Sequence, residues 1–409
     1  MVDKVGPFLP YGRQNISDDD IQAVVDVLKS DHLTTGPAIE RFEAALCDAT
    51  DAPFAVACSS GTAALHLGVL ALGLGPGDIG IVPAVTFTAT ANCLRFAGAE
   101  VRFADVEPDT GLVSPETIKA CLDQCKADGT RDRVKAIFTV HLAGQTADMN
   151  TIADLAAAED LILIEDACHA LGGAWQERSD DWAKVGSCKR SALAAFSFHP
   201  VKTIAMGEGG AVTTRDEALA DRMRLLRSHG ITRDENLFVG FPDGDGGTGR
   251  GDPWHYEMLD LGFNYRASDL HCALGASQLA RLGEFVESRR RLADLYDDQL
   301  AVLAPTVVPI ARSAAVQPAW HLYAVLIDFE AVGRTKRELM AHLRTAGIGS
   351  QVHYIPVPWQ PYYQGCTPAR DYPGAKRYYE RELSLPLFFG MADNDVKRVV
   401  QAVKRWVEG

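Results

Sequence analysis

The sequence predicts an α/β fold with a mostly parallel sheet, followed by a smaller α+β unit. Three observations lead to this prediction. From about residue 52, short apolar and β-branched runs alternate with helical stretches. These runs are almost continuously apolar, which is typical of parallel strands that helices cover on both faces. After about residue 269 the pattern changes, and a chain of 409 residues is long enough for two cores.

The first part begins with a helix that follows Ser17. Serine is a favourable N-cap, and the acidic residues 18–20 suit the positive end of a helix. Apolar residues then recur at helical spacing at Ile21, Val24, Val25 and Leu28. The strands that we expect in the sheet span residues 54–58, 79–82, 101–104, 136–140, 162–165 and 193–198.

The second part starts with a long helical stretch over residues 270–300, and we expect its basic run 289–291 on the solvated side. Beyond it, two apolar segments predict strands and two periodic segments predict helices. These are strands 322–327 and 349–353 and helices 336–346 and 394–407. We therefore expect a large domain over residues 1–281, including an N-terminal arm, and a small domain over residues 282–409.

Composition narrows the class of protein. The formal net charge of −14 argues against nucleic acid or an anionic membrane surface as a general partner. The nine cysteines have no metal-site spacing, which indicates reduced thiols and no metal centre. The N-terminus lacks the apolar segment of a signal peptide, and the longest apolar run, around residues 63–74, is too short to span a bilayer. We expect a soluble, cytoplasmic protein.

A glycine-rich segment, 244–249, formally matches the dinucleotide-binding pattern GxGxxG. It lies in a polar loop rather than between a strand and a helix, so it fails the structural requirement of that motif. A nicotinamide-dependent oxidoreductase is therefore disfavoured, and an insertion or hairpin tip is the preferred interpretation.

The most informative residue is Lys202, in an apolar segment that follows the predicted strand 193–198 and precedes the glycine-rich run 207–210. Burial disfavours the charged form of a lysine and lowers its pKa, and a neutral amine can form a Schiff base with a pyridoxal aldehyde. Ser197 lies five residues before it. Taken alone, the segment fits a surface lysine in a loop equally well.

Three further segments complete a possible ligand site. Ser60, Gly61 and Thr62 stand between a strand and a helix, where free N–H groups bind phosphate, although a plain capped turn fits too. Asp166 ends a buried strand. It could hold a pyridine nitrogen protonated, or it could be an ordinary acidic capping residue. We expect the rings of Phe87 and His169 to pack against such a heterocycle. Both rings fit ordinary core packing as well.

These motifs together resemble the DegT/DnrJ/EryC1/StrS family of sugar aminotransferases over essentially the whole chain. The resemblance rests on Ser60–Thr62, the run 165–169, the segment 197–210 and the run 262–266 that contains Asn264. It implies a fold-type I transferase with a seven-stranded-type sheet, pyridoxal 5′-phosphate as cofactor and a homodimer with shared active sites.

The same resemblance implies roles for individual residues. Lys202 forms the Schiff base, Asp166 pairs with the pyridine nitrogen, and Thr62 and Ser197 hold the phosphate. Asn264 reaches that phosphate from the partner subunit. The cofactor-binding set is Ser60, Gly61, Thr62, Phe87, Asp166, His169, Ser197, Lys202 and Asn264. A lysine at position 202 also argues against the dehydratase branch of the family, in which a histidine stands there.

Within the family, the run 349–356 is most similar to the UDP-4-amino-4,6-dideoxy-N-acetyl-β-L-altrosamine transaminases of pseudaminic acid biosynthesis. This likeness implies amino transfer to C4 of a UDP-linked 4-keto-6-deoxy-N-acetyl-hexosamine, with L-glutamate as the expected donor. The implied substrate contacts are Tyr11, Asp31, His32, Leu33, Thr34, Asn264, Gln351, Val352, His353 and Tyr354. Arg13 and Arg266 are candidates for the diphosphate. The alternatives are another nucleotide 4-ketosugar, or a noncatalytic cofactor-binding sensor. The long insertion at 244–251 departs from the family pattern.

Overall fold

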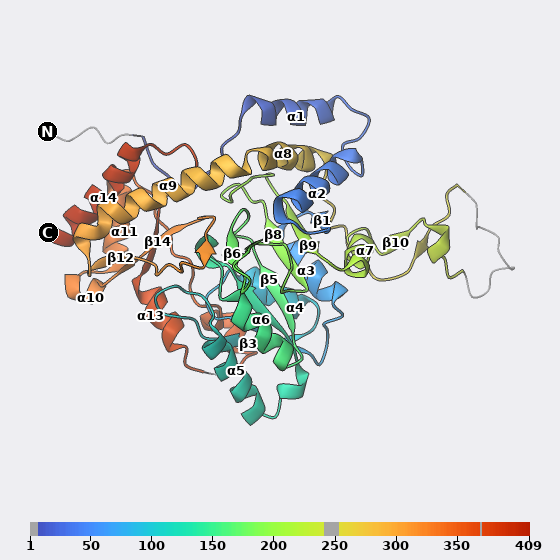
Figure 1. Ribbon diagram of the computed structural model, residues 1–409, viewed down its shortest axis with the longest axis horizontal. Helices are drawn as coiled ribbons and strands as arrows, with labels where there is room; N and C mark the ends of the chain where they lie inside the picture. The colour runs from blue at the N-terminus through green and yellow to red at the C-terminus, as the bar shows by residue number, and fades with distance from the viewer. Residues whose placement is uncertain (1–6, 241–252, 369) are drawn as a thin grey trace.

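The computed structural model describes residues 7–240, 253–368 and 370–409, and a seven-stranded sheet lies at its centre (Figure 1). The strand order is β1-β9-β8-β5-β4-β2-β3. The strands are β1 (Phe54–Cys58), β2 (Ile79–Pro83), β3 (Glu100–Ala104), β4 (Val134–Val140), β5 (Ile162–Asp166), β8 (Leu193–Ser197) and β9 (Gly210–Thr214). The six strands expected from the sequence are all present, and the predicted α/β class is confirmed.

The strand β9 was missed. It is the antiparallel member of this sheet, paired with β1 on one side and β8 on the other. All five of its residues are buried, yet it begins with Gly210 and ends with two threonines, so it lacks a long apolar run. A fully buried position between two strands also removes the alternation that usually identifies a strand.

Among the described residues, eight α-helices belong to the part of the chain that contains this sheet. They are α1 (Asp18–Leu28), α2 (Pro37–Thr50), α3 (Gly61–Ala71), α4 (Thr88–Phe96), α5 (Pro115–Ala127), α6 (Met149–Ala158), α7 (Glu217–Leu226) and α8 (Asp269–Ala280). The predicted N-cap of α1 is confirmed, because the Ser17 hydroxyl accepts from Asp20 N–H and the Asp20 carboxylate accepts from Ser17 N–H. Helix α3 packs on β8 and β9, which places its N-terminus at the end of the sheet.

The C-terminal part has its own sheet, in the order β12-β14-β15. Its elements are α9 (Leu282–Leu300), β12 (Val307–Pro309), β14 (Tyr323–Ile327), α10 (Phe329–Val332), α11 (Lys336–Thr345), α12 (Pro361–Gln364), α13 (Pro373–Arg381), β15 (Glu382–Leu385) and α14 (Asp393–Glu408). The stretch expected as one helix is two, α8 and α9, which meet at Arg281. A division into domains at 281/282 stays a prediction.

Two expectations for this part are wrong. Residues 349–353 do not form a strand, because Gly349 N–H donates to the N-terminal arm at Leu9 O and only Gln351 pairs with β15. The basic run of α9 is not wholly solvated either. Arg289 is 2% exposed and donates to the carbonyl oxygens of Trp320 and Leu387, so an arginine that looked like a surface residue lies in the core.

Small sheets complete the description. One contains β13 (Val316–Gln317), β6 (Ala174–Gln176) and β7 (Trp182–Lys184), and the other contains β10 (Ile231–Thr232) and β11 (Glu257–Met258). The segment with β10 projects from the body in Figure 1. The predicted insertion 244–251 lies outside the described residues. Across the described chain, no helix has both the length and the apolar character needed to cross a membrane.

Candidate active site

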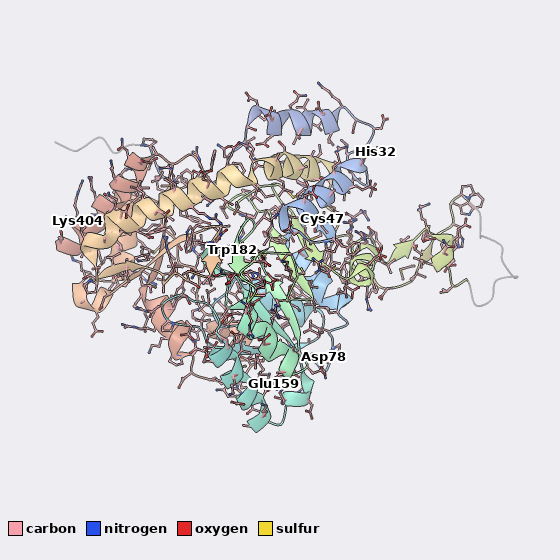
Figure 2. All side chains as sticks on the ribbon, in the orientation of Figure 1. His32, Cys47, Asp78, Glu159, Trp182 and Lys404 are labelled. Atoms are coloured by element: carbon pink, nitrogen blue, oxygen red, sulfur yellow. The ribbon has the colours of Figure 1, made fainter. Side chains whose placement is uncertain are left out.

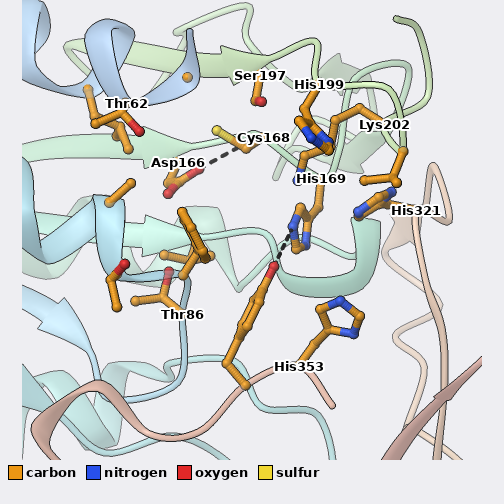
Figure 3. A pocket seen from close by; sticks show the side chains of 18 of the residues that line it. Thr62, Thr86, Asp166, Cys168, His169, Ser197, His199, Lys202, His321 and His353 are labelled. Atoms are coloured by element: carbon orange, nitrogen blue, oxygen red, sulfur yellow. Dashed lines mark hydrogen bonds between the residues drawn. The ribbon is translucent and has the colours of Figure 1, made fainter. Parts of the chain in front are cut away.

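A cavity of about 550 Å³ lies at the carboxyl ends of β5 and β8 (Figure 3). Ligands bind in this position in open α/β sheets. The turn after β1, the connection after β2 and the loop after β8 form its sheet side, and residues 351–355 form the opposite side. Segments more than 300 residues apart in the sequence thus share one pocket.

The turn between β1 and α3 forms a narrow cradle. The Ser60 hydroxyl caps α3 by accepting a 3.1 Å hydrogen bond from Ala63 N–H. A Cβ on Gly61 would lie 2.7 Å from Cβ of Ser197, and a Cβ on Gly210 would lie 2.2 Å from the carbonyl oxygen of Ser60. Glycine is therefore required at both positions, and the N-terminus of an eleven-residue helix opens beside the Ser197 hydroxyl.

Asp166 lies at the end of β5 and is 5% exposed. Its Oδ2 accepts a 2.6 Å hydrogen bond from the Thr90 hydroxyl, and its Oδ1 accepts one of 3.2 Å from Cys168 N–H. The hydroxyls of Thr86 and Thr90 are 2.8 Å apart. The carboxylate is therefore fixed in orientation. From the segment that follows β2, the sequence analysis named only Phe87 as a site residue, and the contact of Thr90 with Asp166 was missed.

Lys202 lines the same cavity, on the loop that follows β8. Two backbone hydrogen bonds within this loop fix its conformation. Lys202 N–H donates to His199 O and Met206 N–H donates to Phe198 O, both at 2.8 Å. Burial lowers the pKa of Lys202, and the nearby Cys168 and Asp166 oppose that shift. The amine therefore loses its proton more readily than a surface lysine does.

A cluster of imidazole rings stands beside this amine. The rings of His169 and His321 have centroids 4.4 Å apart, and the Tyr354 hydroxyl lies 3.2 Å from His169 Nε2. Burial, with a smaller effect of the Lys202 charge, lowers the pKa of both histidines well below its usual value. Figure 3 shows His321 next to Lys202. His321 was missed as a site residue.

Residues from both ends of the chain form the opposite wall. Tyr11 and residues 351–354 line the cavity, as does Phe87, whose side chain is 57% exposed and stands at the mouth. The Tyr11 ring lies 5.7 Å from the His353 ring, and the Phe87 ring lies 5.9 Å from the Tyr354 ring. The predicted substrate contacts 351–354 and Tyr11 thus share a pocket with Lys202.

Other predicted contacts lie elsewhere in this single chain. Residues 31–34 are exposed before α2, where Leu33 O accepts a hydrogen bond from Asp269 N–H, and Figure 2 labels His32 there. Asn264 is exposed and pairs with Ser228. None of these lines the cavity, so their part in the site stays a prediction.

The two candidates for the diphosphate are also outside the main cavity. The guanidinium of Arg13 lies over the Phe388 ring, 5.4 Å from its centroid. Arg266 lines a second, polar cavity of about 440 Å³ together with Arg224 and Arg227. The second cavity combines these cations with Glu40 and Glu43.

The residues of the main cavity fit a phosphorylated pyridine aldehyde. The Gly61 cradle suits a phosphate, the fixed carboxylate of Asp166 suits a ring nitrogen, and the amine of Lys202 suits an aldehyde. Among the described residues, no group of three or more His, Cys, Asp or Glu side chains is arranged to hold a metal ion.

Comparisons with known proteins agree with this arrangement. Residues 14–404 match the model of the DegT/DnrJ/EryC1/StrS aminotransferase family. The chain is 36% identical over 414 residues to the spore coat polysaccharide biosynthesis protein SpsC of Bacillus subtilis, with all of both chains covered.

Solved structures show the same fold along the whole chain. Helicobacter pylori PseC, an aminotransferase involved in pseudaminic acid biosynthesis, is 28% identical, with a TM-score of 0.85 over 98% of this chain and 99% of that one. Streptococcus pneumoniae Spr1654 in its PLP form is 27% identical, with a TM-score of 0.83 over 98% and 99% of the two chains. The chain therefore belongs to the DegT/DnrJ/EryC1/StrS family of sugar aminotransferases.

Proposed function

We propose that this aminotransferase transfers an amino group from L-glutamate to C4 of a UDP-linked 4-keto-6-deoxy-N-acetyl-hexosamine. The product is UDP-4-amino-4,6-dideoxy-N-acetyl-β-L-altrosamine, an intermediate on the way to pseudaminic acid. The observation that carries the proposal is that residues 351–354, the segment most characteristic of that subgroup, line the same cavity as Lys202. The overall likeness to PseC supports it.

The cofactor of the enzyme is pyridoxal 5′-phosphate, and Spr1654 was solved with it and in a PMP form. When bound, it supplies an electron sink for the carbon that carries the amine. We assign the phosphate to Ser60, Gly61, Thr62 and Ser197. The carboxylate of Asp166, fixed by Thr90, would hold the ring nitrogen protonated.

Lys202 would bind the cofactor aldehyde and, once displaced by substrate, carry a proton between the substrate carbon and the cofactor. A base for this step works best when its pKa lies near the working pH, and burial shifts Lys202 in that direction. Phe87 and His169, which both line the cavity, would pack against the cofactor ring.

The assembly that we propose is a homodimer that shares its active sites. Asn264 and residues 31–34 are exposed and do not line the cavity of their own chain, which leaves them available to contribute to a partner's site. We place the protein in the cytoplasm, where its nucleotide-sugar substrate would be available.

One observation favours a second candidate. The identity to SpsC, 36%, exceeds the identity to PseC, and SpsC belongs to the biosynthesis of a spore coat polysaccharide. The sugar could therefore be another nucleotide 4-ketosugar, because pocket shape and one stereocentre decide between such substrates.

The test is turnover of the purified holoenzyme with L-glutamate and a panel of UDP- and dTDP-linked 4-ketosugars. Amination of the UDP-linked N-acetyl sugar above the others would support the proposal. Preference for a dTDP-linked sugar would reject it in favour of the second candidate. Cofactor binding without amine transfer to any ketosugar would indicate a sensor. The Lys202→Ala variant provides the background rate.

A further inference from the structure

Two buried side chains of β15 hold His353 from behind. Nδ1 of His353 lies 2.8 Å from the hydroxyl oxygen of Ser384, and this hydroxyl donates a 2.7 Å hydrogen bond to Oε1 of Glu382. The other oxygen of the same carboxylate accepts a 3.0 Å hydrogen bond from His353 N–H. His353 is 5% exposed, and Ser384 and Glu382 are fully buried. These three residues form a continuous chain from the cavity into the core.

Backbone hydrogen bonds hold these three hydrogen-bonded residues in place. Gln351 N–H donates to Ser384 O at 3.1 Å, and Ser384 N–H donates back to Gln351 O at 2.8 Å. The His353 ring lies on the cavity side, within 5.7 Å of the Tyr11 ring and 4.9 Å of the Tyr354 ring (Figure 3). With Nδ1 engaged by β15, the ring nitrogen left for a ligand is Nε2.

Hydrogen-bond counting decides which ring nitrogen carries the proton. A serine hydroxyl has one hydrogen, and Ser384 gives it to the Glu382 carboxylate. Its oxygen can then only accept from Nδ1, so Nδ1 must carry the hydrogen. Burial lowers the pKa of His353 to about 3, so the ring is neutral and Nε2 has a free lone pair.

We propose that Ser384 and Glu382 are positioning residues that hold His353 as its Nδ1–H tautomer, so that Nε2 accepts a hydrogen bond from the sugar substrate. The donor would be a hydroxyl or the amide N–H of an N-acetyl group. This inference rests on the proposed function, because it assigns a recognition group to the ketosugar. It adds two residues that no substrate reaches directly.

The charge of Glu382 decides which group donates and which accepts in the hydrogen bonds that join Glu382, Ser384 and His353. Burial raises the pKa of Glu382 to about 7, although Lys336 on α11, the Ser384 hydroxyl and His353 N–H oppose the shift. Tyr354 and Tyr378 also face it. A protonated Glu382 would donate to Ser384, which would donate to Nδ1 and leave Nε2 as a donor. As the pH rises through about 7, Glu382 loses its proton. This ionisation favours the tautomer in which Nε2 of His353 accepts a hydrogen bond.

The Glu382→Gln variant tests this directly. The Gln amide would donate to Ser384 while its oxygen accepts from His353 N–H, which reverses the chain and moves the proton to Nε2. Nitrogen-15 spectra of histidine-labelled holoenzyme report the tautomer, and the signal lost in His353→Asn identifies the residue. At about pH 8 we expect Nδ1–H in the wild type and Nε2–H in the variant.

Kinetics provide the second readout. In the wild type, KM for the ketosugar should fall about fivefold as the pH rises from about 6 to about 8, as expected for one neutral hydrogen bond. In Glu382→Gln it should stay at the high value throughout. Glu107→Gln is the matched control, because the Ser114 hydroxyl donates to Glu107 with the same 2.7 Å geometry outside the cavity. This control should keep the wild-type profile.

Three results would overturn the proposal: an Nε2–H tautomer in the wild type at about pH 8, the same tautomer in the wild type and Glu382→Gln, or an unchanged KM profile in that variant. If the variant does not fold, the wild-type spectrum alone decides. The tautomer of the resting enzyme does not depend on which sugar is aminated. An error in the substrate assignment is therefore distinguishable from an error in this inference.

Discussion

The hydroxyl of Thr90 donates a 2.6 Å hydrogen bond to Oδ2 of Asp166, and both side chains are buried. The bond joins the start of α4 to the end of β5. A buried carboxylate with this partner cannot rotate freely, so its outer edge keeps one direction toward the cavity. The position of Asp166 relative to the cofactor ring thus depends on a threonine that does not line the cavity itself.

We predict that Thr90→Val, which keeps the shape and removes the donor, lowers kcat/KM. A hydrogen bond to a charged group contributes about 1.5–3 kcal/mol, so the loss should be about ten- to a hundredfold. Thr139→Val is the control, since that buried hydroxyl faces Ile164 O and Met149 rather than the site. Steady-state kinetics of both variants check this, and equal activities would contradict the role given to Thr90.

We predict that His321→Gln weakens the loss of stability in acid. Burial lowers the pKa of His321, so the unfolded chain binds more protons than the folded one below about pH 6.5, and stability falls as the pH decreases through that value. Glu382, whose pKa is raised, acts in the opposite direction, so only the difference between the variant and the wild type is informative.

Urea unfolding of the apo-protein at about pH 7 and about pH 5.5 measures this difference. The free energy of unfolding of the wild type should fall more between the two pH values than that of His321→Gln. His342→Gln serves as the control, because His342 lies on α11 away from the cavity, where its Nε2 contacts Ala402 O. If the free energy of unfolding changed equally with pH in the wild type and in His321→Gln, His321 would contribute nothing to the acid sensitivity, and the prediction would be wrong.

Arg289→Met should destabilise the protein. Replacing a buried charge by an apolar side chain removes a desolvation cost, but the three carbonyl oxygens of Trp320, His321 and Leu387 would lose their donor. Each unsatisfied buried group costs about 1–3 kcal/mol, so we expect a net loss of about 3 kcal/mol. Urea unfolding measures it, with the exposed neighbour Arg291→Met as control. A more stable Arg289→Met protein would mean that desolvation outweighs the hydrogen bonds.

The sequence was sufficient for the parts of the fold and site that depend on local pattern. Apolar runs located six strands of the central sheet, and the turn at Gly61 was recognisable because a phosphate cradle needs glycine beside hydroxyl residues. Long-range contacts were not recognisable. Nothing near Arg289 in the sequence indicates the carbonyl oxygens that hold it in the core. Glu382 likewise gains its importance only because β15 lies behind His353.

We predict that two inactive variants complement each other. If Asn264 serves the partner's site, a dimer of Lys202→Ala with Asn264→Ala has one site with both residues intact and one site with neither. Random exchange of subunits makes half of the dimers mixed, so about a quarter of the wild-type activity should return. The variants are mixed after mild dissociation and assayed against each variant treated alone. Because Lys202 and Asn264 would belong to the same site if each chain worked independently, an inactive mixture would place Asn264 in its own chain's site. An Asn264→Ala enzyme that is active by itself would place Asn264 outside the reaction.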